Sequence, residues 1–514
     1  MDSIFNTDKH IKLGIWGLGR GLNFIRSAAS LNIDVVAGCD IHPHMRANFQ
    51  KLVPNAFVTA DEDEFLARDF DAVLVATYFP DHCKHSLKAL EAGKHVMCEV
   101  TSFGTPADGV KLVEAVEKSG KVYNLLENYP FTKPNMFLKR LWDEGFFGEF
   151  MYGEYEYVHD CRTLCYAYNV DGGLPVEPGY TLHNWRCALD GHLYNTHSLG
   201  PLMNITGRRP VRVEALPCDV MLPGYPVWEE GTHGRICPSL ITMDNGGLMR
   251  NLMGSTTNDN HMAGRLFGTN ASAENIRDGL KIRVGGCGNG TFLSINPDWP
   301  ADLGKLAEAT GHGGGDFWEL YFFARQILTG EPAPWNVYAA ADVTITGLLA
   351  TRSARQNGAP QDIPDFRNKS DRDKFRNDNH AYKMLDATSI FPEGHDPAIS
   401  GNFTPLMVKL FPMNANNGIL LAKRAWDGMK VFPYLADNDS RLNVVKSVAK
   451  LIDELPNIAD WCHQAEKIMN TYPDTLPGKT IRQSLDYVDL KKIYDTEASV
   501  AELRAWLTEV AKNR

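Results

Sequence analysis

The sequence contains no apolar run long enough to span a membrane and no CxxC pair among its ten cysteines. Residues 1–10 are polar and carry no apolar core of a secretion signal. Several cysteines lie inside apolar runs, where a free thiol behaves as a small hydrophobic side chain. These absences argue against a disulfide-stabilised secreted domain, and we expect a reduced, cytoplasmic protein without membrane contact.

Clusters of basic residues are also absent. Lysines and arginines number 52 against 63 aspartates and glutamates, which gives a formal net charge of −11. A nucleic-acid surface needs the opposite balance, so no nucleic-acid partner is expected. One group of potential metal ligands matches no familiar zinc spacing, so no metal is expected either; its members are His159, Asp160, Cys161 and Cys165.

The most informative segment is the glycine-rich stretch at residues 13–21, Leu-Gly-Ile-Trp-Gly-Leu-Gly-Arg-Gly. A strand is expected before it over Ile11–Trp16 and a helix after it over Leu22–Ser30. A second strand over Val35–Cys39 then ends at Asp40. This order is typical of the first unit of a dinucleotide-binding domain. A glycine-rich turn without a cofactor is the alternative, but the context that the motif requires is present.

Each residue of this turn has an expected role. Gly17 permits the tight turn, and Gly19 lets the backbone approach a pyrophosphate at the N-terminus of the next helix. Arg20 and Gly21 complete the expected cofactor-binding turn. Asp40 lies where a carboxylate accepts hydrogen bonds from an adenosine ribose and repels a 2′-phosphate, so NAD is favoured over NADP.

Strands and helices continue to alternate as far as about residue 127. The expected strands are Asp71–Thr77, Lys94–Cys98 and Lys121–Leu126, and the expected helices are His82–Ala92 and Pro106–Ser119. Apolar strands separated by helices form a doubly wound parallel sheet. The acidic run Asp61–Glu64 is expected to be the solvated start of a helix rather than a glycosidase pair of carboxylates.

The pattern changes after about residue 148. Alternating apolar and polar residues predict a mostly antiparallel open sheet, with strands over Glu149–His159, Arg212–Ala215 and Arg235–Thr242. Helical spacing follows over Asp316–Leu328 and Ala339–Gln356. A chain of 514 residues exceeds one ordinary domain. We expect an α/β cofactor domain over 1–130, an α+β substrate domain over 131–365 and a helical C-terminal extension over 366–514.

Residues 90–99, Leu-Glu-Ala-Gly-Lys-His-Val-Met-Cys-Glu, resemble the Gfo/Idh/MocA oxidoreductase family when taken with the glycine turn. The resemblance implies an N-terminal Rossmann domain. It also places further residues at the cofactor, which are Arg20, Thr77, His82, Glu99 and Asn128. Most dehydrogenases of that family continue the strand as Glu-Lys-Pro, with a lysine that serves the hydroxyl being oxidised. This chain has Val100 in that place, which argues against an ordinary sugar dehydrogenase.

Other segments are similar to a narrower group, glycoside hydrolase family 109. Residues 191–201, Gly-His-Leu-Tyr-Asn-Thr-His-Ser-Leu-Gly-Pro, resemble that family's Gly-Asn-Leu-Tyr-Pro-Thr-His-Gly-Leu-Gly-Pro segment. Residues 153–160 resemble its Glu-x-x-Tyr-Ile-His-Asp strand, and residues 311–316 resemble its Gly-His-Gly-Gly-Met-Asp turn. Glu127-Asn128 matches a Glu-Asn pair there. The likeness covers about residues 10–365.

This second resemblance implies NAD-dependent cleavage of a glycoside. Oxidation at C3 of the sugar acidifies the C2 hydrogen, a base removes it, the C1 group leaves, water adds and the hydride returns. Tyr194 and His197 are three residues apart and can face one pocket. His197 suits the C3 hydroxyl proton, and Tyr194 suits the C2 proton if a cation lowers its pKa. Glu154 is a third candidate, and packing or solvent exposure is the alternative for all three.

The residues expected to contact substrate lie near the same segments. Tyr180, Trp185 and Arg186 suggest a sugar platform, although a core tryptophan fits the pattern equally well. His312 is expected in the Gly-rich turn as a substrate contact, with a plain helix start as the alternative. Asn195 departs from the family's proline, so we expect a small glycoside or oligosaccharide without naming the sugar.

Two other functions stay open at this point. A dehydrogenase could release NADH, with His197 replacing the missing lysine. A non-catalytic NAD-binding sensor could instead use the helical extension as a partner surface. We also expect a homo-oligomer, although residues 380–514 carry no motif that assigns them to an interface or to an active-site cap.

Overall fold

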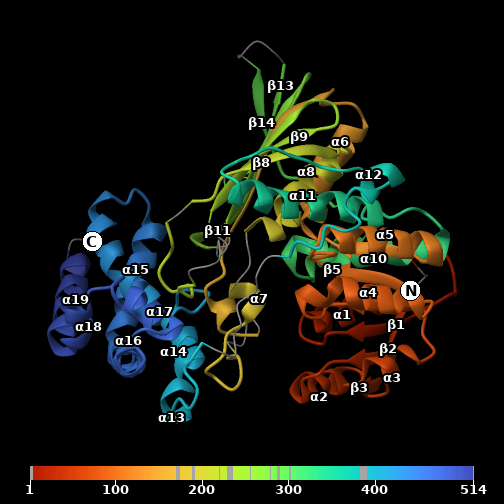
Figure 1. Cartoon of the computed structure of the whole chain (residues 1–514). Coiled ribbons are helices and arrows are strands. Elements are labelled where there is room, and N and C mark those ends of the chain that lie inside the picture. The colour runs from red at the N-terminus through yellow and green to blue at the C-terminus, as the bar shows by residue number, and fades with distance from the viewer. Residues whose placement is uncertain are drawn as a thin grey trace.

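The computed structural model describes residues 4–168, 174–187, 191–218, 220–228, 236–254, 256–277, 279–285, 290–299, 303–381 and 390–512. Two sheets and a helical C-terminal region follow one another along the chain (Figure 1). Among the described residues, no helix has both the length and the apolar character needed to cross a membrane. The cysteines in these residues are all free thiols.

The first sheet is parallel and doubly wound, as the sequence predicts. Its strand order is β3-β2-β1-β4-β5-β6. The strands are β1 (Ile11–Trp16), β2 (Ile33–Cys39), β3 (Phe57–Thr59), β4 (Ala72–Val75), β5 (His95–Glu99) and β6 (Tyr123–Leu126). The order reverses between β1 and β4, and ligands of such sheets bind at the carboxyl ends of the strands beside this point.

The helices of this domain are α1 (Ile25–Ala28), α2 (Pro43–Leu52), α3 (Glu62–Leu66), α4 (His82–Glu91) and α5 (Pro106–Ser119). Helices α4 and α5 begin where the sequence predicts them, whereas the helix expected over Leu22–Ser30 is a 3₁₀ turn over Arg20–Phe24 followed by the short helix α1. The carboxylate of Asp61 accepts from the backbone N–H groups of Asp63 and Glu64, so the acidic run is the capped start of α3. The side chain of Thr105 caps α5 in the same way, and Gly120 ends it at φ +63°.

The second sheet has nine strands in the order β14-β13-β12-β11-β7-β10-β9-β8-β15. Only the β7–β10 pair is parallel among its described pairings, which confirms a mostly antiparallel sheet. Its strands are β7 (Phe150–Asp160), β8 (Pro210–Ala215), β9 (Cys237–Met243), β10 (Leu248–Gly254), β11 (Thr256–Gly268), β12 (Ser272–Ile276), β13 (Gly279–Val284), β14 (Thr291–Ile295) and β15 (Gln361–Asp362).

Helices cover one face of this sheet and join it to the first domain. They are α6 (Lys133–Asp143), α8 (Thr196–Thr206) and α11 (Val337–Arg355). Helix α10 (Gly315–Thr329) packs instead against β1, β6 and α1 of the first domain. Helix α8 packs on β7, and α11 contacts β8, α5 and β6. Helix α11 therefore touches strands of both sheets and joins the two domains.

The C-terminal region is helical, as expected. It consists of α13 (Pro397–Ser400), α14 (Phe403–Leu410), α15 (Gly418–Val431), α16 (Asn438–Thr471), α17 (Leu476–Leu485), α18 (Leu490–Tyr494) and α19 (Thr496–Lys512). These helices share a hydrophobic core with the segment around Tyr166, separate from the core between the two sheets. The short helix α12 (Lys369–Asp373) lies instead on α5, where Arg372 pairs with Glu117.

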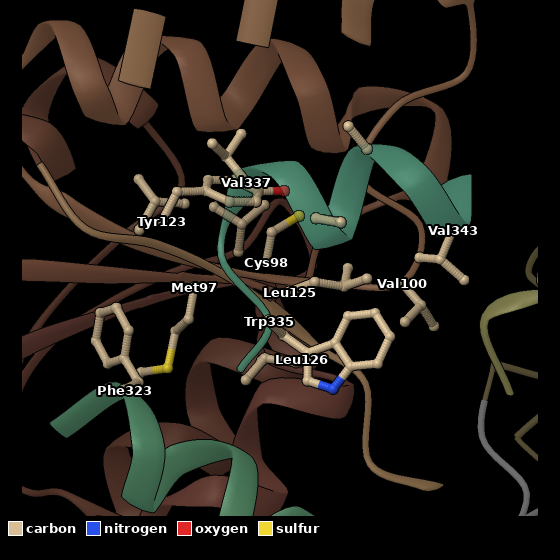
Figure 2. Packing of buried hydrophobic residues seen from close by; sticks show 14 of the residues in the cluster. Met97, Cys98, Val100, Tyr123, Leu125, Leu126, Phe323, Trp335, Val337 and Val343 are labelled. Carbon is tan, nitrogen blue, oxygen red and sulfur yellow. The ribbon is translucent and has the colours of Figure 1, made fainter. Parts of the chain in front are cut away.

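The strand position without the family lysine is filled by apolar packing. The side chain of Val100 is 4% exposed and belongs to the core between the sheets. Figure 2 shows it in the same cluster as Leu126, Trp335 and Val343. This residue therefore offers a methyl surface and no group that can accept a proton.

Candidate active site at the carboxyl edge of the parallel sheet

The glycine turn after β1 has the geometry that a dinucleotide needs. Gly17 has φ +93°, and a Cβ there would lie 2.2 Å from the carbonyl oxygen of Ala76. A Cβ on Gly21 would lie 2.5 Å from Cγ2 of Ile15. A Cβ on Gly19 would meet no atom within 4 Å, so this residue faces open space. The turn is thus tight at two glycines and open at the one where a pyrophosphate approaches.

Asp40 is held at the end of β2. One of its carboxylate oxygens accepts from the backbone N–H of Leu18 at 2.7 Å, and the other accepts from that of His42 at 2.8 Å. The carboxylate is therefore fixed beside the glycine turn, and each oxygen keeps a second lone pair. This arrangement fits the ribose hydroxyls of NAD.

His82 is buried near the carboxyl ends of the parallel strands, and its ring contacts two loops. Its Nδ1 is 3.0 Å from the carbonyl oxygen of Thr101, and its Nε2 is 3.2 Å from that of Thr77. Both nitrogens face acceptors, so the cationic ring, with two donors, satisfies both contacts. Burial by itself lowers the pKa of His82, but Cys98, the Thr101 carbonyl and Glu99 outweigh it and raise the pKa to about 9. The hydroxyl of Thr77 pairs with Nδ1 of His85 at 2.7 Å.

Three of the sequence-predicted residues, Arg20, Asn128 and His312, meet at one carboxylate, that of Asp316. Arg20 donates to both oxygens of Asp316 at 2.8 and 2.9 Å, and its Nε donates to Glu99 at 2.8 Å. Nδ2 of Asn128 and Nδ1 of His312 lie 3.2 and 2.9 Å from the same Asp316 oxygen. Burial raises the pKa of Asp316, but hydrogen bonds from Arg20 and His312 hold it well below its ordinary value.

Tyr194 and His197 do share one site. Tyr194 ends the 3₁₀ turn Gly191–Tyr194, His197 lies in the first turn of α8, and their ring centroids are 4.6 Å apart. Nδ1 of His197 lies 2.9 Å from both carboxylate oxygens of Glu127, which follows β6. Both partners are buried, with side chains 5% and 0% exposed. Because the carboxylate only accepts, Nδ1 carries a proton and Nε2 is left as the basic nitrogen.

Tyrosine rings enclose His197. Its ring lies 4.5 Å from that of Tyr129 and 4.8 Å from that of Tyr157, both in edge-on contacts. Burial raises the pKa of Tyr129, Tyr157 and Tyr194, so all three are neutral phenols. His159 lies two residues beyond Tyr157, and its ring is 5.7 Å from Tyr157.

Of the expected substrate contacts, Trp185 and Arg186 reach this group and Tyr180 does not. The guanidinium of Arg186 lies 3.9 Å from the ring of Trp185 and 5.4 Å from that of Tyr194. Tyr180 packs 4.6 Å from His395, on the helical C-terminal region. The structure therefore offers Tyr180 a packing role and places a cation beside Tyr194.

Glu154 also lies apart from His197. Tyr155 and Tyr157 are buried on one face of β7, so Glu154 projects from the opposite face. There it accepts from Tyr152 at 3.0 Å and from Arg250 at 3.1 Å. The alternation of a strand separates this carboxylate from His197 by the thickness of the sheet.

Glu127 and Asp316 lie in segments that resemble the family, but the sequence alone gives neither residue a catalytic or binding role. Glu127 directly follows the apolar strand β6, and an acid at the carboxyl end of a parallel strand is a usable signal. Asp316 offers no such signal, because only the folded chain brings it to Arg20, 296 residues away in the sequence.

Comparison with known proteins agrees with this geometry. Residues 11–126 match the model of an oxidoreductase family with an NAD-binding Rossmann fold. Residues 297–372 match the model of the glycosyl hydrolase 109 C-terminal domain. The second match contains His312 and Asp316, and the first contains the glycine turn and Asp40.

Curated relatives and solved structures extend these matches. A glycosyl hydrolase family 109 protein of Saccharopolyspora erythraea is 28% identical, over 71% of this chain and 85% of the relative. An alpha-N-acetylgalactosaminidase of Tannerella forsythia is 28% identical, over 65% and 80%. Levoglucosan dehydrogenase with NADH and levoglucosan is similar in fold (TM-score 0.57, 18% identity, 69% of this chain and 100% of that one). An inositol dehydrogenase homologue of Azotobacter vinelandii with NADH and myo-inositol gives a TM-score of 0.55 at 20% identity, over 70% of this chain and 100% of that one.

These findings confirm the resemblance in the sequence. The chain is similar to the Gfo/Idh/MocA oxidoreductases over residues 11–126 and to the glycosyl hydrolase 109 C-terminal domain over residues 297–372.

Proposed function

We propose that the chain is an NAD-dependent glycosidase that cleaves its substrate without net oxidation. The observation that carries the proposal is the buried group of Glu127, His197 and Tyr194 at the edge of the NAD-binding sheet. In this group His197 is a base held by Glu127, and Tyr194 is a neighbouring phenol. The position of the usual lysine is occupied by Val100. The glycine turn and Asp40 would hold NAD, which would supply a hydride acceptor and donor for C3 of the sugar.

His197 is assigned the proton of the C3 hydroxyl. Its Nδ1 donates to Glu127, which leaves Nε2 to accept that proton and stabilises the imidazolium that results. The charged ring then becomes the proton donor for the oxygen that leaves C1. A carboxylate behind a histidine orients the ring and fixes its tautomer, as this pair does.

Tyr194 is assigned the removal of the proton on C2 of the sugar, a step that follows proton transfer to His197. Burial raises the pKa of Tyr194 and outweighs the opposite effect of Arg186. Once His197 is protonated, a second positive charge lies beside the ring, whose centroid is 4.6 Å away. Positive neighbours favour the phenolate, which forms by release of the phenol proton to solvent and is the form that removes a proton from carbon. Trp185 and Arg186 form the adjoining wall and are proposed to contact the sugar.

The remaining expectations are part of the same proposal. The substrate is a small glycoside or oligosaccharide, and the Tannerella forsythia relative's name makes N-acetylgalactosaminides the first class to test. Asp40 is proposed to favour NAD over NADP, and Thr77 to line the cofactor. The boundaries 1–130, 131–365 and 366–514, and a homo-oligomer, are also proposed.

The experiment is cleavage of aryl glycosides in D2O, with product followed by NMR and NADH followed at 340 nm. The proposal requires deuterium at C2 of the product and no accumulation of NADH. A glycosidase that acts by direct displacement leaves C2 untouched. Hydrolysis without deuterium, under conditions where the product itself does not exchange, overturns the mechanism. Stoichiometric NADH with a keto sugar would favour the dehydrogenase, whose fold the structural relatives share.

A further inference from the structure

The donors of Arg20 are directed at carboxylates. Two of its nitrogens bind the two oxygens of Asp316, and its Nε binds Glu99. The planar guanidinium matches a carboxylate with two parallel hydrogen bonds, which a lysine cannot reproduce. The side chain of Asp316 is only 3% exposed and that of Arg20 is 25% exposed, so this pair is partly buried rather than a surface contact.

Asp316 also contacts two residues on the other side of the site. It is contacted by Asn128, which follows β6, and by His312, four residues earlier in the turn before α10. Two glycines permit this close approach. A Cβ on Gly311 would lie 2.7 Å from a carboxylate oxygen of Asp316, and one on Gly315 would lie 2.3 Å from the carbonyl oxygen of Asn128. One carboxylate thus joins the NAD turn to the His312 turn.

The two carboxylates in contact with Arg20 more than neutralise its single positive charge, so no further anion is needed there. Glu99 and Asp316 supply two carboxylates in direct contact, and Glu319 lies 3.9 Å away. Burial raises the pKa of Glu319 well above its ordinary value, with Asp316 and Glu99 adding to the effect. A cation already paired with two carboxylates attracts a pyrophosphate weakly.

We propose that Arg20 is a positioning residue, which binds Asp316 and thereby couples the NAD-binding turn to the His312 turn. Arg20 acts on the cofactor through the shape of the turn and not through direct contact with phosphate. Filling of the NAD site and placement of His312 then depend on each other. The coupling to NAD stands on its own, and only the consequence for the sugar rests on the proposed function.

Asp316→Asn tests this, because the two roles of Arg20 predict opposite changes. The full-length chain, freed of nucleotide on charcoal, is titrated with NAD by calorimetry. If Arg20 positions the turn, Asp316→Asn raises the Kd for NAD by about tenfold, the size expected when residues of one network are uncoupled. If Arg20 binds the pyrophosphate, the same change frees the guanidinium and lowers the Kd, which overturns the proposal.

Arg20→Lys gives a second, independent outcome. Lysine keeps the charge but loses the paired geometry, so the proposal expects it to weaken NAD binding as much as Arg20→Gln does. A Lys variant with wild-type affinity overturns it. Addition of Asp316→Asn to Arg20→Gln should cause no further loss, because both changes break the same link.

A matched control separates the coupling from general loss of a buried ion pair. Asp342, on α11, is 2% exposed and pairs with Arg367 at 2.8 Å. Asp342→Asn should lower the melting temperature and leave the Kd for NAD unchanged. If it weakens NAD binding as much as Asp316→Asn does, the effect is one of stability and the proposal fails. Because the readout is NAD binding, failure here leaves the glycosidase proposal intact, and absence of glycosidase activity leaves this result intact.

Discussion

The two faces of strand β7 show how one segment serves two different surroundings. On one face Tyr155 and Tyr157 are buried, and Tyr157 meets His197 at 4.8 Å. On the other face Glu154 and Glu156 share Arg250, with contacts of 3.1 and 2.7 Å. Successive residues of a strand point in opposite directions, so residues one apart in sequence belong to separate environments.

The two faces of β7 differ in their exposure to solvent as much as in the types of residue they carry. The carboxylates of Glu154 and Glu156 are each 20% exposed, and water screens their ion pairs. The carboxylate of Glu127 is fully buried against His197, where an unpaired partner is costly. Carboxylates of the same chemistry should therefore respond very differently to the same substitution.

The largest effect is expected for His197→Ala. Removal of the group assigned to the C3 hydroxyl proton should lower kcat on an aryl glycoside by about 10²- to 10⁴-fold. NAD content and melting temperature of the purified variant serve as controls for folding. Near wild-type turnover in a folded, NAD-loaded variant would show that the ring only packs there.

A somewhat smaller loss is expected for Tyr194→Phe, about 10²-fold in kcat. Phenylalanine keeps the ring between Arg186 and His197 and removes only the hydroxyl. Exchange of the C2 hydrogen in D2O should fall by the same factor as cleavage. Exchange that persists while cleavage is lost would contradict the assignment of Tyr194 to the C2 proton.

Glu127→Gln should cost about tenfold in kcat with little change in KM, since the amide still occupies the space but no longer stabilises the imidazolium. Glu127→Asp is the conservative comparison, because aspartate keeps the negative charge but its shorter side chain holds the carboxylate farther from His197. The assignment of Glu127 fails if Gln is harmless and Asp is not, because shape and not charge would then be what matters.

The smallest effect is expected for Glu154→Gln on the outer face of β7. Turnover should stay within about twofold, and the free energy of unfolding should fall by about 1 kcal/mol or less, as for a solvent-screened ion pair. This variant is the matched control for Glu127→Gln. A loss of turnover comparable to that of Glu127→Gln would remove the contrast between the two faces and restore Glu154 as a catalytic candidate.

The sequence predicted the parallel sheet well, because its signals are local. Each strand is an apolar run that ends at a turn, and α5 begins and ends at the residues expected, Pro106 and Ser119. The glycine turn and Asp40 were likewise evident, since a tight turn and an acid after the next strand lie within one βαβ unit. Helical spacing gave α10 and α11 to within two residues.

The strands between residues 248 and 295 were not assigned individually from the sequence. They are partly exposed and carry mixed patterns, as in β14, where four of five residues are exposed. In such strands cross-strand partners decide the structure more than local propensity does. The face on which Glu154 lies was equally undecided until the register of β7 against β10 and β11 was known.

By itself the sequence determined the cofactor fold, the pairing of Tyr194 with His197 and the absence of the usual lysine. All of these are properties of short segments, read from residue type and spacing. Only the tertiary structure decided that Glu127 supports His197, that Asp316 receives Arg20, and that Glu154 and Tyr180 lie elsewhere. Those contacts join residues far apart in the chain, and they form because burial of a charged group requires a partner that only the folded chain brings within reach.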